Sequence, residues 1–194
     1  MAPTAVPPTA NHKAVAVKKL DIACGQDKKK GFKGIDLSGD ADITHDLNVT
    51  PWPIKTNTVE EVNCVHYVGH IPHHRPEWGT KDGWFVFFDE LHRILKPDGV
   101  AEFIHPYVWH ARAFWDPTHV RFIHEVTWYY LSRQWREANQ LDHYQADCDF
   151  EVVTIEGVGL SDESNSWNQE RQQFSRNHYI NLIPDLHVII RAVK

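Results

Sequence analysis

The sequence predicts an α/β fold, a three-layer sandwich built on a mostly parallel sheet. Short apolar runs of strand length alternate along the chain with longer segments whose apolar residues recur at helical spacing. The 194 residues, 42% of them hydrophobic, suffice for one well-buried domain. Residues 1–12 are rich in Pro and Ala and lack the apolar core of a signal peptide, so we expect a disordered leader before a single domain over 13–194.

The stretch from Val15 to Gly25 organises this prediction. It contains a buried strand over 15–23 that delivers Asp21 and then Gly25 to one edge of the sheet. A second strand over 33–37 brings Asp36 to the same edge. In a parallel sheet the ligand crevice lies beyond the carboxyl ends of the strands, where a glycine lets the backbone approach a ligand and an acid can accept from ribose hydroxyls. The pattern therefore predicts a nucleoside site.

The connection between these two strands is unusually short. A crossover between parallel strands normally takes a dozen or more residues and usually a helix. Residues 24–32 leave no room for one, so the first crossover is expected to be shortened. Its three lysines, 28–30, are interpreted as a solvated loop. The remaining elements are predicted in chain order as a short strand over 41–47, a helical turn over 58–62, a strand over 61–67, a helix over 81–95, a strand over 100–107, a helix over 125–138, a strand over 150–155, a helical stretch over 161–178 and a strand over 185–193.

Composition excludes several classes of protein. No apolar run is long enough to cross a bilayer, so no membrane partner is expected. The net charge of −6 does not indicate a nucleic-acid binder held by bulk phosphate attraction, although a local basic stripe leaves nucleic acid possible. The three cysteines are odd in number and widely spaced, which favours a reducing, cytoplasmic location.

Five motifs in order resemble one family. They are Leu20-Asp-Ile-Ala-Cys-Gly25, Gly34-Ile-Asp36-Leu, Asp42-Ile-Thr-His-Asp46-Leu47, Val65-His-Tyr-Val-Gly-His-Ile-Pro72 and Phe88-Asp-Glu-Leu-His-Arg-Ile-Leu-Lys-Pro-Asp-Gly99. Together they resemble class I S-adenosylmethionine-dependent methyltransferases, in particular small bacterial and phage proteins with type 11 methyltransferase domains. The resemblance implies a Rossmann-like sheet with an antiparallel last strand, S-adenosylmethionine as cofactor and S-adenosylhomocysteine as product.

The resemblance also implies the roles of individual residues. Asp21 and Gly25, with the backbone of Ala23 and Cys24, would line the methionine end of the cofactor. Asp36 would accept from the ribose hydroxyls. At the adenine, Asp46 would accept from the amino group and Leu47 would pack on the ring. His66 and Tyr67, just beyond the fourth strand, would face the methyl-transfer site.

Two departures from the family pattern leave other functions open. Gln26-Asp27-Lys28 stands where the family has more glycines, and Gly69 replaces a glutamate common after the fourth strand. The leading hypothesis is methyl transfer to an unidentified small or polymeric acceptor. The alternatives are a non-catalytic methyltransferase-like binding or scaffold module, and an enzyme that cleaves S-adenosylmethionine itself.

Candidate catalytic residues follow the fifth major strand. In Asp116-Pro-Thr-His119, His119 is a candidate general base because its ordinary pKa lies near operating pH, and Asp116 is either part of the site or a helix cap. His66 is a second candidate base. The histidine spacing matches no helix-borne zinc motif, so no metal is predicted. The aromatic residues Tyr107, Trp109, Phe114 and Trp115 are interpreted as the core of a lid, with stacking on a planar substrate as the alternative.

Overall fold

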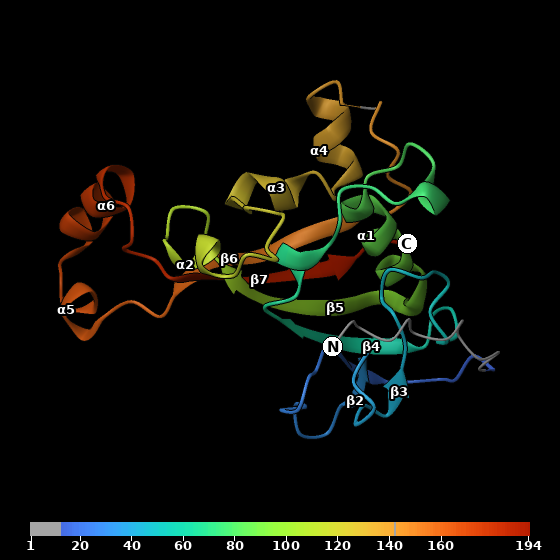
Figure 1. Ribbon diagram of the computed structural model, residues 1–194. Coiled ribbons are helices and arrows are strands. Elements are labelled where there is room, and N and C mark those ends of the chain that lie inside the picture. Colours follow the sequence, from blue (N-terminus) through green and yellow to red (C-terminus); the bar gives the residue numbers. More distant parts are fainter. Residues whose placement is uncertain (1–12, 142) are drawn as a thin grey trace.

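The computed structural model describes residues 13–141 and 143–194, so the predicted leader lies outside the described residues. Their strands form one seven-stranded sheet in the order β3-β2-β1-β4-β5-β7-β6 (Figure 1). The strands are β1 (Lys19–Ile22), β2 (Lys33–Asp36), β3 (Ile43–Thr44), β4 (Val59–Val65), β5 (Leu95–Pro106), β6 (Phe150–Val158) and β7 (Asp185–Ala192). The helices are η1 (Val68–His70), η2 (Pro76–Trp78), α1 (Gly83–Ile94), α2 (Arg112–Trp115), α3 (Glu125–Tyr129), α4 (Arg133–Ala138), α5 (Asp162–Asn165) and α6 (Gln169–His178).

The strand directions confirm the predicted sheet. The ladders that join β3, β2, β1, β4 and β5 are all parallel. Strand β7 lies between β5 and β6 and is antiparallel to both. The last strand is therefore the one that reverses direction, as predicted, and the carboxyl ends of β1, β2 and β4 meet at one edge.

Two local predictions are wrong. A helical turn was predicted over 58–62, but β4 begins at Val59, which pairs with Leu95 at the start of β5. The single helix predicted over 125–138 is broken into α3 and α4. The Ser132 hydroxyl accepts from the amide of Trp135, and this side-chain cap starts a new helix.

The hydrophobic core lies between the sheet and helices α1 and α3. Asp82 caps α1 by accepting from the Trp84 amide at 2.7 Å, which sets the rotation of the helix. Phe88 of α1 and Trp128 of α3 then pack on Phe103 of β5, with ring centroids 5.6 and 4.9 Å from that ring. All three side chains are fully buried. This aromatic layer fixes the position of the helices on one face of the sheet.

The opposite face of the central strands carries polar side chains. Lys19 pairs with Glu61 across β1 and β4, and both side chains remain more than two-fifths exposed. His187 of β7 lies 2.9 Å from carboxylate oxygens of Glu102 and of Glu156. In the described residues this face is covered by such pairs and by the first crossover rather than by a helix, so the second helical layer of a three-layer sandwich is incomplete.

The first crossover is shortened, as predicted, and one buried carboxylate holds it. Asp21 accepts from the Lys29 amide at 2.7 Å and from the Asn63 side-chain amide at 2.6 Å. The Lys29 ammonium reaches Glu102 at 2.7 Å, and Lys28 pairs with Asp42 at 2.7 Å. The three lysines are exposed, as predicted for a solvated loop, and the ion pairs of Lys28 and Lys29 also tie the crossover to the β2–β3 connection and to β5.

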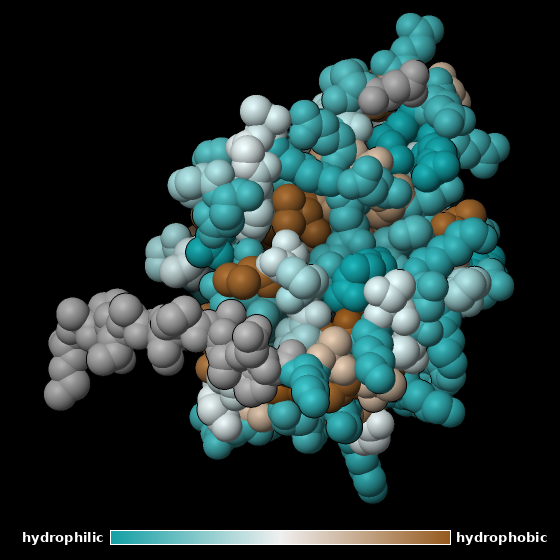
Figure 2. Space-filling model, turned by 90° about the vertical axis from the view of Figure 1, so that its right-hand side faces the viewer, coloured by the Kyte–Doolittle hydropathy of each residue, from teal (hydrophilic) through white to brown (hydrophobic). Residues whose placement is uncertain are grey.

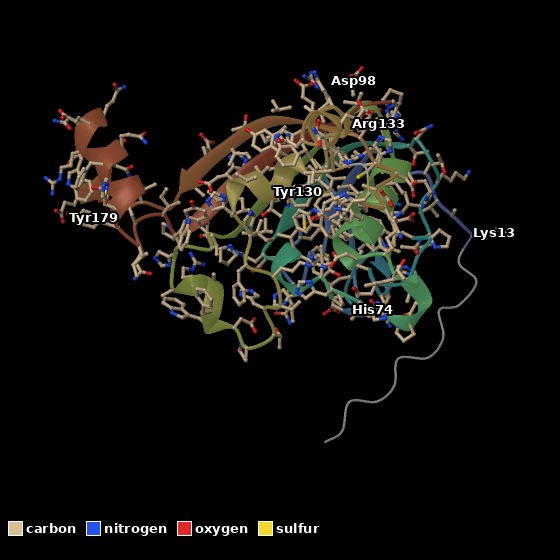
Figure 3. The ribbon with its side chains drawn as sticks, turned by 90° about the horizontal axis from the view of Figure 1, so that it is seen from above. Lys13, His74, Asp98, Tyr130, Arg133 and Tyr179 are labelled. Carbon is tan, nitrogen blue, oxygen red and sulfur yellow. The ribbon has the colours of Figure 1, made fainter. Side chains whose placement is uncertain are left out.

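Other parts of the surface are mostly polar. The face shown in Figure 2 is largely hydrophilic, and its apolar residues form small separate patches. Helices α5 and α6 form an arm that extends away from the sheet, with Tyr179 at its far end (Figures 1 and 3). None of the helices in the described residues combines the length and the apolar character that a membrane span requires.

Replacing Asp21 tests the role of the buried carboxylate. We expect Asp21→Ala to lower the free energy of unfolding by about 3 kcal/mol, because hydrogen bonds to a charged group are lost and the Asn63 amide is left without its acceptor. Urea unfolding followed by circular dichroism measures the change. Glu61→Gln on the same face is the control and should cost under about 1 kcal/mol, since its ion pair is exposed. Equal losses in the two variants would show that Asp21 has no special role.

His105 makes stability depend on pH. Burial lowers the pKa of its side chain to about 4, and the ring accepts from the Trp128 indole while its other nitrogen faces the Pro106 carbonyl. His105 of the unfolded chain takes up a proton near pH 6.5, whereas the buried side chain of the folded protein does not until about pH 4. This group therefore lowers the free energy of unfolding by about 3 kcal/mol as the pH falls from about 6.5 to 4. Urea unfolding over that range should show a shallower pH dependence for His105→Gln than for the wild type, and parallel curves would contradict the assignment.

Candidate functional site

The structure brings Gly25 and Asp36 together at the carboxyl edge of the sheet. One carboxylate oxygen of Asp36 accepts from the Gly25 amide at 3.0 Å and the other accepts from Ser38 at 2.8 Å. The backbone turns sharply here, with a φ of +54° at Ala23 and +52° at Gly25. The end of β2 is thus joined directly to the loop that leaves β1.

Cys24 lies on the inner side of this loop. A Cβ at position 34 would overlap its sulfur, so the glycine at 34 in β2 makes room for the thiol. Burial raises the pKa of the Cys24 thiol, and the negative charges of Asp36 and Asp21 raise it further. The side chain therefore stays a neutral thiol at physiological pH and packs between two acids.

The predicted adenine residues lie beyond β3. Asp46 accepts from both the backbone and the side-chain amide of Asn48 at 2.9 Å, and Arg75 approaches it at 3.5 Å. Leu47 is buried. Tyr67 follows β4 beside this group, and its pKa is raised, first by burial and then by the charges of Cys64, Asp46 and Asp36. Its hydroxyl therefore stays protonated near the acids and can donate.

The cavity lined by Asp82, Trp84 and Tyr144 lies elsewhere. Its volume is about 410 Å³ and it opens at the start of α1. None of the predicted cofactor residues lines it. Gly25 is exposed and Asp36 and Asp46 are half-buried, so they instead form a partly exposed edge at the strand ends.

A second group of side chains gathers on the other side of His66. This residue has a φ of +56°, and its amide donates to the Ile104 carbonyl at 2.7 Å, so the chain turns sharply where β4 ends. The pKa of His66 is lowered, chiefly by burial, although the Asp185 charge opposes the shift. His66 is therefore neutral at pH 7 and can accept a proton.

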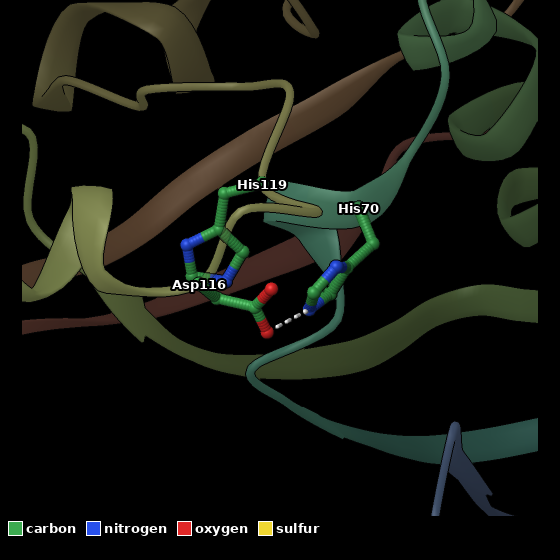
Figure 4. A group of neighbouring side chains, drawn as sticks. All are labelled: His70, Asp116 and His119. Carbon is green, nitrogen blue, oxygen red and sulfur yellow. Dashed lines mark ion pairs between the residues drawn. The ribbon is translucent and has the colours of Figure 1, made fainter.

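Asp116 and His119 meet His70 at the end of η1 (Figure 4). Asp116 accepts from the Thr118 amide and hydroxyl at 2.8 and 2.7 Å, and these bonds lower its pKa. His70 lies 4.0 Å from the same carboxylate. The two predicted catalytic residues of this segment are thus brought together, and the structure adds a third side chain that sequence reasoning did not place with them.

Gly69 explains how these segments fit. A Cβ at position 69 would lie 3.1 Å from the His119 ring, so a larger residue there would displace it. The Gly69 carbonyl accepts from the amides of Val120 and Arg121 at 2.9 and 3.1 Å. Gly69 therefore leaves the space that the His119 ring occupies.

The aromatic residues of this segment are not a buried core. Tyr107 is buried and donates to Glu125 at 2.9 Å, which agrees with the prediction for that residue alone. Trp109, Phe114 and Trp115 are 54%, 60% and 71% exposed. The interpretation as lid core is wrong for these three, because more than half of each side chain is exposed.

Sequence reasoning missed several residues that support the site. Asn63, Arg75 and Thr118 each hold one of the predicted acids through the contacts given above. Arg112 pairs with the buried Asp185 at 2.6 Å beneath His66. The one available signal was Asn63, a polar residue between the apolar residues Val62 and Cys64, which must find a partner when buried.

The fold is similar to that of solved S-adenosylmethionine-dependent methyltransferases. A methyltransferase of that kind from Archaeoglobus fulgidus matches with 17% identity and a TM-score of 0.59 over 93% of this chain and 88% of its own. A putative one from Listeria monocytogenes matches with 12% identity and a TM-score of 0.51 over 92% of each chain. The plantazolicin methyltransferase BpumL, solved with a pentazolic desmethylPZN analogue and SAH, matches with 14% identity and a TM-score of 0.51 over 92% of this chain and 77% of its own. No protein-family model matches the chain, and no curated protein matches it significantly.

Substituting Gly69 tests the packing of His119. We expect Gly69→Ala to displace the imidazole and to cost about 1 kcal/mol of stability, because the added methyl meets the ring. The ring resonances of His119 and His70 in ¹H–¹³C spectra should shift, and urea unfolding measures the cost. Gly39→Ala is the matched control, since a Cβ there meets nothing within 4 Å. Unchanged histidine resonances in Gly69→Ala would contradict the contact.

Proposed function

We propose that the protein binds S-adenosylmethionine at the edge formed by Gly25, Asp36 and Asp46 and transfers its methyl group to an acceptor. The observation that carries the proposal is the direct contact between Asp36 at the end of β2 and the Gly25 loop after β1. In a parallel sheet this is the position where a ribose meets an acid and where backbone approaches the ligand closely. The shared fold supports the same conclusion.

The chemistry of the edge suits this cofactor. S-adenosylmethionine is a sulfonium cation with a polar nucleoside, so it favours carboxylates and backbone groups over a phosphate cradle. Asp36 would exchange its bonds to the Gly25 and Ser38 amides for ribose hydroxyls. Asp46 would accept from the adenine amino group beside Leu47. Asp21, Ala23 and Cys24 would form the wall at the methionine end.

The acceptor would approach from the side of His66 and His119. Methyl transfer is an in-line displacement, so the protein mainly has to hold the nucleophile about 3 Å from the methyl carbon, opposite the sulfur. His66 is neutral and turned toward this side by its backbone, and His119 stays the candidate base predicted from the sequence. The exposed ring of Trp115 beside Asp116 offers a surface on which a planar acceptor could stack.

Removing the ribose acid tests the proposed site. Asp36→Ala should weaken binding of S-adenosylhomocysteine at least tenfold, on the order of 1.5–3 kcal/mol for a lost charge-assisted bond. Calorimetric titration of the full chain measures the affinity. Asp40→Ala removes an exposed carboxylate of the next turn and is the matched control. Normal binding by Asp36→Ala would refute the ribose assignment, and a wild type that binds neither S-adenosylmethionine nor S-adenosylhomocysteine would refute the proposal and favour a scaffold.

A further inference from the structure

Three side chains with metal-binding atoms converge where η1 meets the segment after α2. One potential ligand atom from each of His70, Asp116 and His119 lies within 4.8 Å of the other two. Figure 4 shows both imidazole rings directed at the same carboxylate. The centroids of the two rings are 4.6 Å apart.

Hydrogen bonds fix which atoms of the two histidines remain free. The His119 Nδ1 lies 2.9 Å from the Ala113 carbonyl, which can only accept, so Nδ1 carries the proton and Nε2 keeps its lone pair. The Thr118 hydroxyl donates its single hydrogen to Asp116 at 2.7 Å. The His70 Nδ1 lies 3.1 Å from the same hydroxyl, so this nitrogen must be the donor in that second hydrogen bond. His70 Nε2 therefore also keeps its lone pair.

This arrangement is the second shell that metal-binding histidines use. A ligating histidine almost always donates its other ring N–H to an oxygen, which fixes the tautomer and the ring orientation. Here Ala113 and Thr118 supply those oxygens, and Thr118 also holds the carboxylate. Two arginines of the same region have carboxylates of their own, since Arg112 pairs with Asp185 and Arg121 with Asp82. The converging lone pairs are thus left for another cation.

The backbone that presents the three side chains is well anchored. The Gly69 carbonyl binds the amides of Val120 and Arg121, and Arg121 donates further to the carbonyls of Ile71 and Pro72 at 2.7 and 2.8 Å. These bonds hold the segment of Asp116 and His119 against the end of η1. The side chains of His70 and Asp116 remain 31% and 44% exposed, so an ion can enter from solvent.

We propose that His70, Asp116 and His119 bind one divalent first-row transition metal ion of the Zn²⁺ class and leave an open coordination position. Two imidazole nitrogens and one carboxylate are the donor set of catalytic zinc sites, which keep the fourth position for water or substrate. Bonds of about 2.0–2.1 Å place ligands on one tetrahedral ion about 3.3 Å apart, so ligand-atom separations that now reach up to 4.8 Å would shorten by up to about 1.5 Å. The site departs from the sequence expectation of no metal and does not depend on the proposed methyl transfer.

A metal here would change how a nucleophile is prepared at this edge. An ion with an open position lowers the pKa of a bound water or hydroxyl and holds it in place. His119 would then act through the ion and not as a free base. An acceptor oxygen bound to the metal would lie beside His66, on the side opposite the predicted cofactor edge.

Cobalt titration tests the proposal. The full chain is treated with a chelator, dialysed and titrated with Co²⁺, whose visible absorption reports histidine and carboxylate coordination. We expect one equivalent to bind. His119→Ala and Asp116→Asn should each weaken binding at least tenfold, and Thr118→Val, which keeps all three ligands, should weaken it by about 10–100-fold. Excess Zn²⁺ should displace the cobalt.

The chain contains 14 histidines, so the control must separate this site from the others. His74→Ala removes an exposed imidazole close to η1 and should leave the titration unchanged. No absorption band at stoichiometric Co²⁺, or a band that His119→Ala leaves intact, would overturn the proposal. Calorimetry with S-adenosylhomocysteine on the same samples reports folding and the cofactor edge separately, so failure of one proposal is distinguishable from failure of the other.

Discussion

The carboxylate of Asp21 is the constraint on which the predicted cofactor edge depends. A crossover without a helix has no apolar face with which to pack on the sheet, so its position must come from polar bonds. Asp21 supplies them by holding the Lys29 amide and the Asn63 side chain while almost fully buried. The loop between β1 and β2 is thereby fixed at its far end, and Gly25 at its near end can meet Asp36. The buried carboxylate of Asp21 thus holds the first crossover against the sheet, as a packed helix does in a crossover of ordinary length.

The carboxyl edge of the sheet has two sides with different chemistry. Asp36, Asp46 and Leu47 lie on the side of β2 and β3, while His70, Asp116 and His119 lie on the side reached from β5. The turn at His66 and Tyr67 separates them, because Tyr67 lies beside the acids and His66 lies beside the histidines. A ligand that spans the turn would meet carboxylates at one end and, at the other, two imidazoles beside the Asp116 carboxylate.

How much the sequence predicts depends on how local the signal is. The nearness of Gly25 and Asp36 was predictable, because parallel strands end at one edge and each residue follows its strand directly. The break at Ser132 had a visible signal as well, since serine is a preferred helix cap. The group around His119 had none. Its members come from positions 70, 116 and 119, and they meet only because the Gly69 carbonyl joins the two segments and its missing side chain leaves room. No spacing rule within one helix describes such a site.

The absent side chain at Gly69 lets the His119 ring lie beside His70. A Cβ at position 69 would lie 3.1 Å from that ring, so a larger residue would require the ring to shift. The imidazoles of His70 and His119 thereby meet the Asp116 carboxylate at this place. The ion pairs on the polar face of the sheet contribute little to stability. Exposed pairs such as Lys19–Glu61 add at most about 1 kcal/mol each. The aromatic core beneath α1 and α3 and the buried carboxylate of Asp21 therefore contribute more to the stability of the fold than these exposed pairs do.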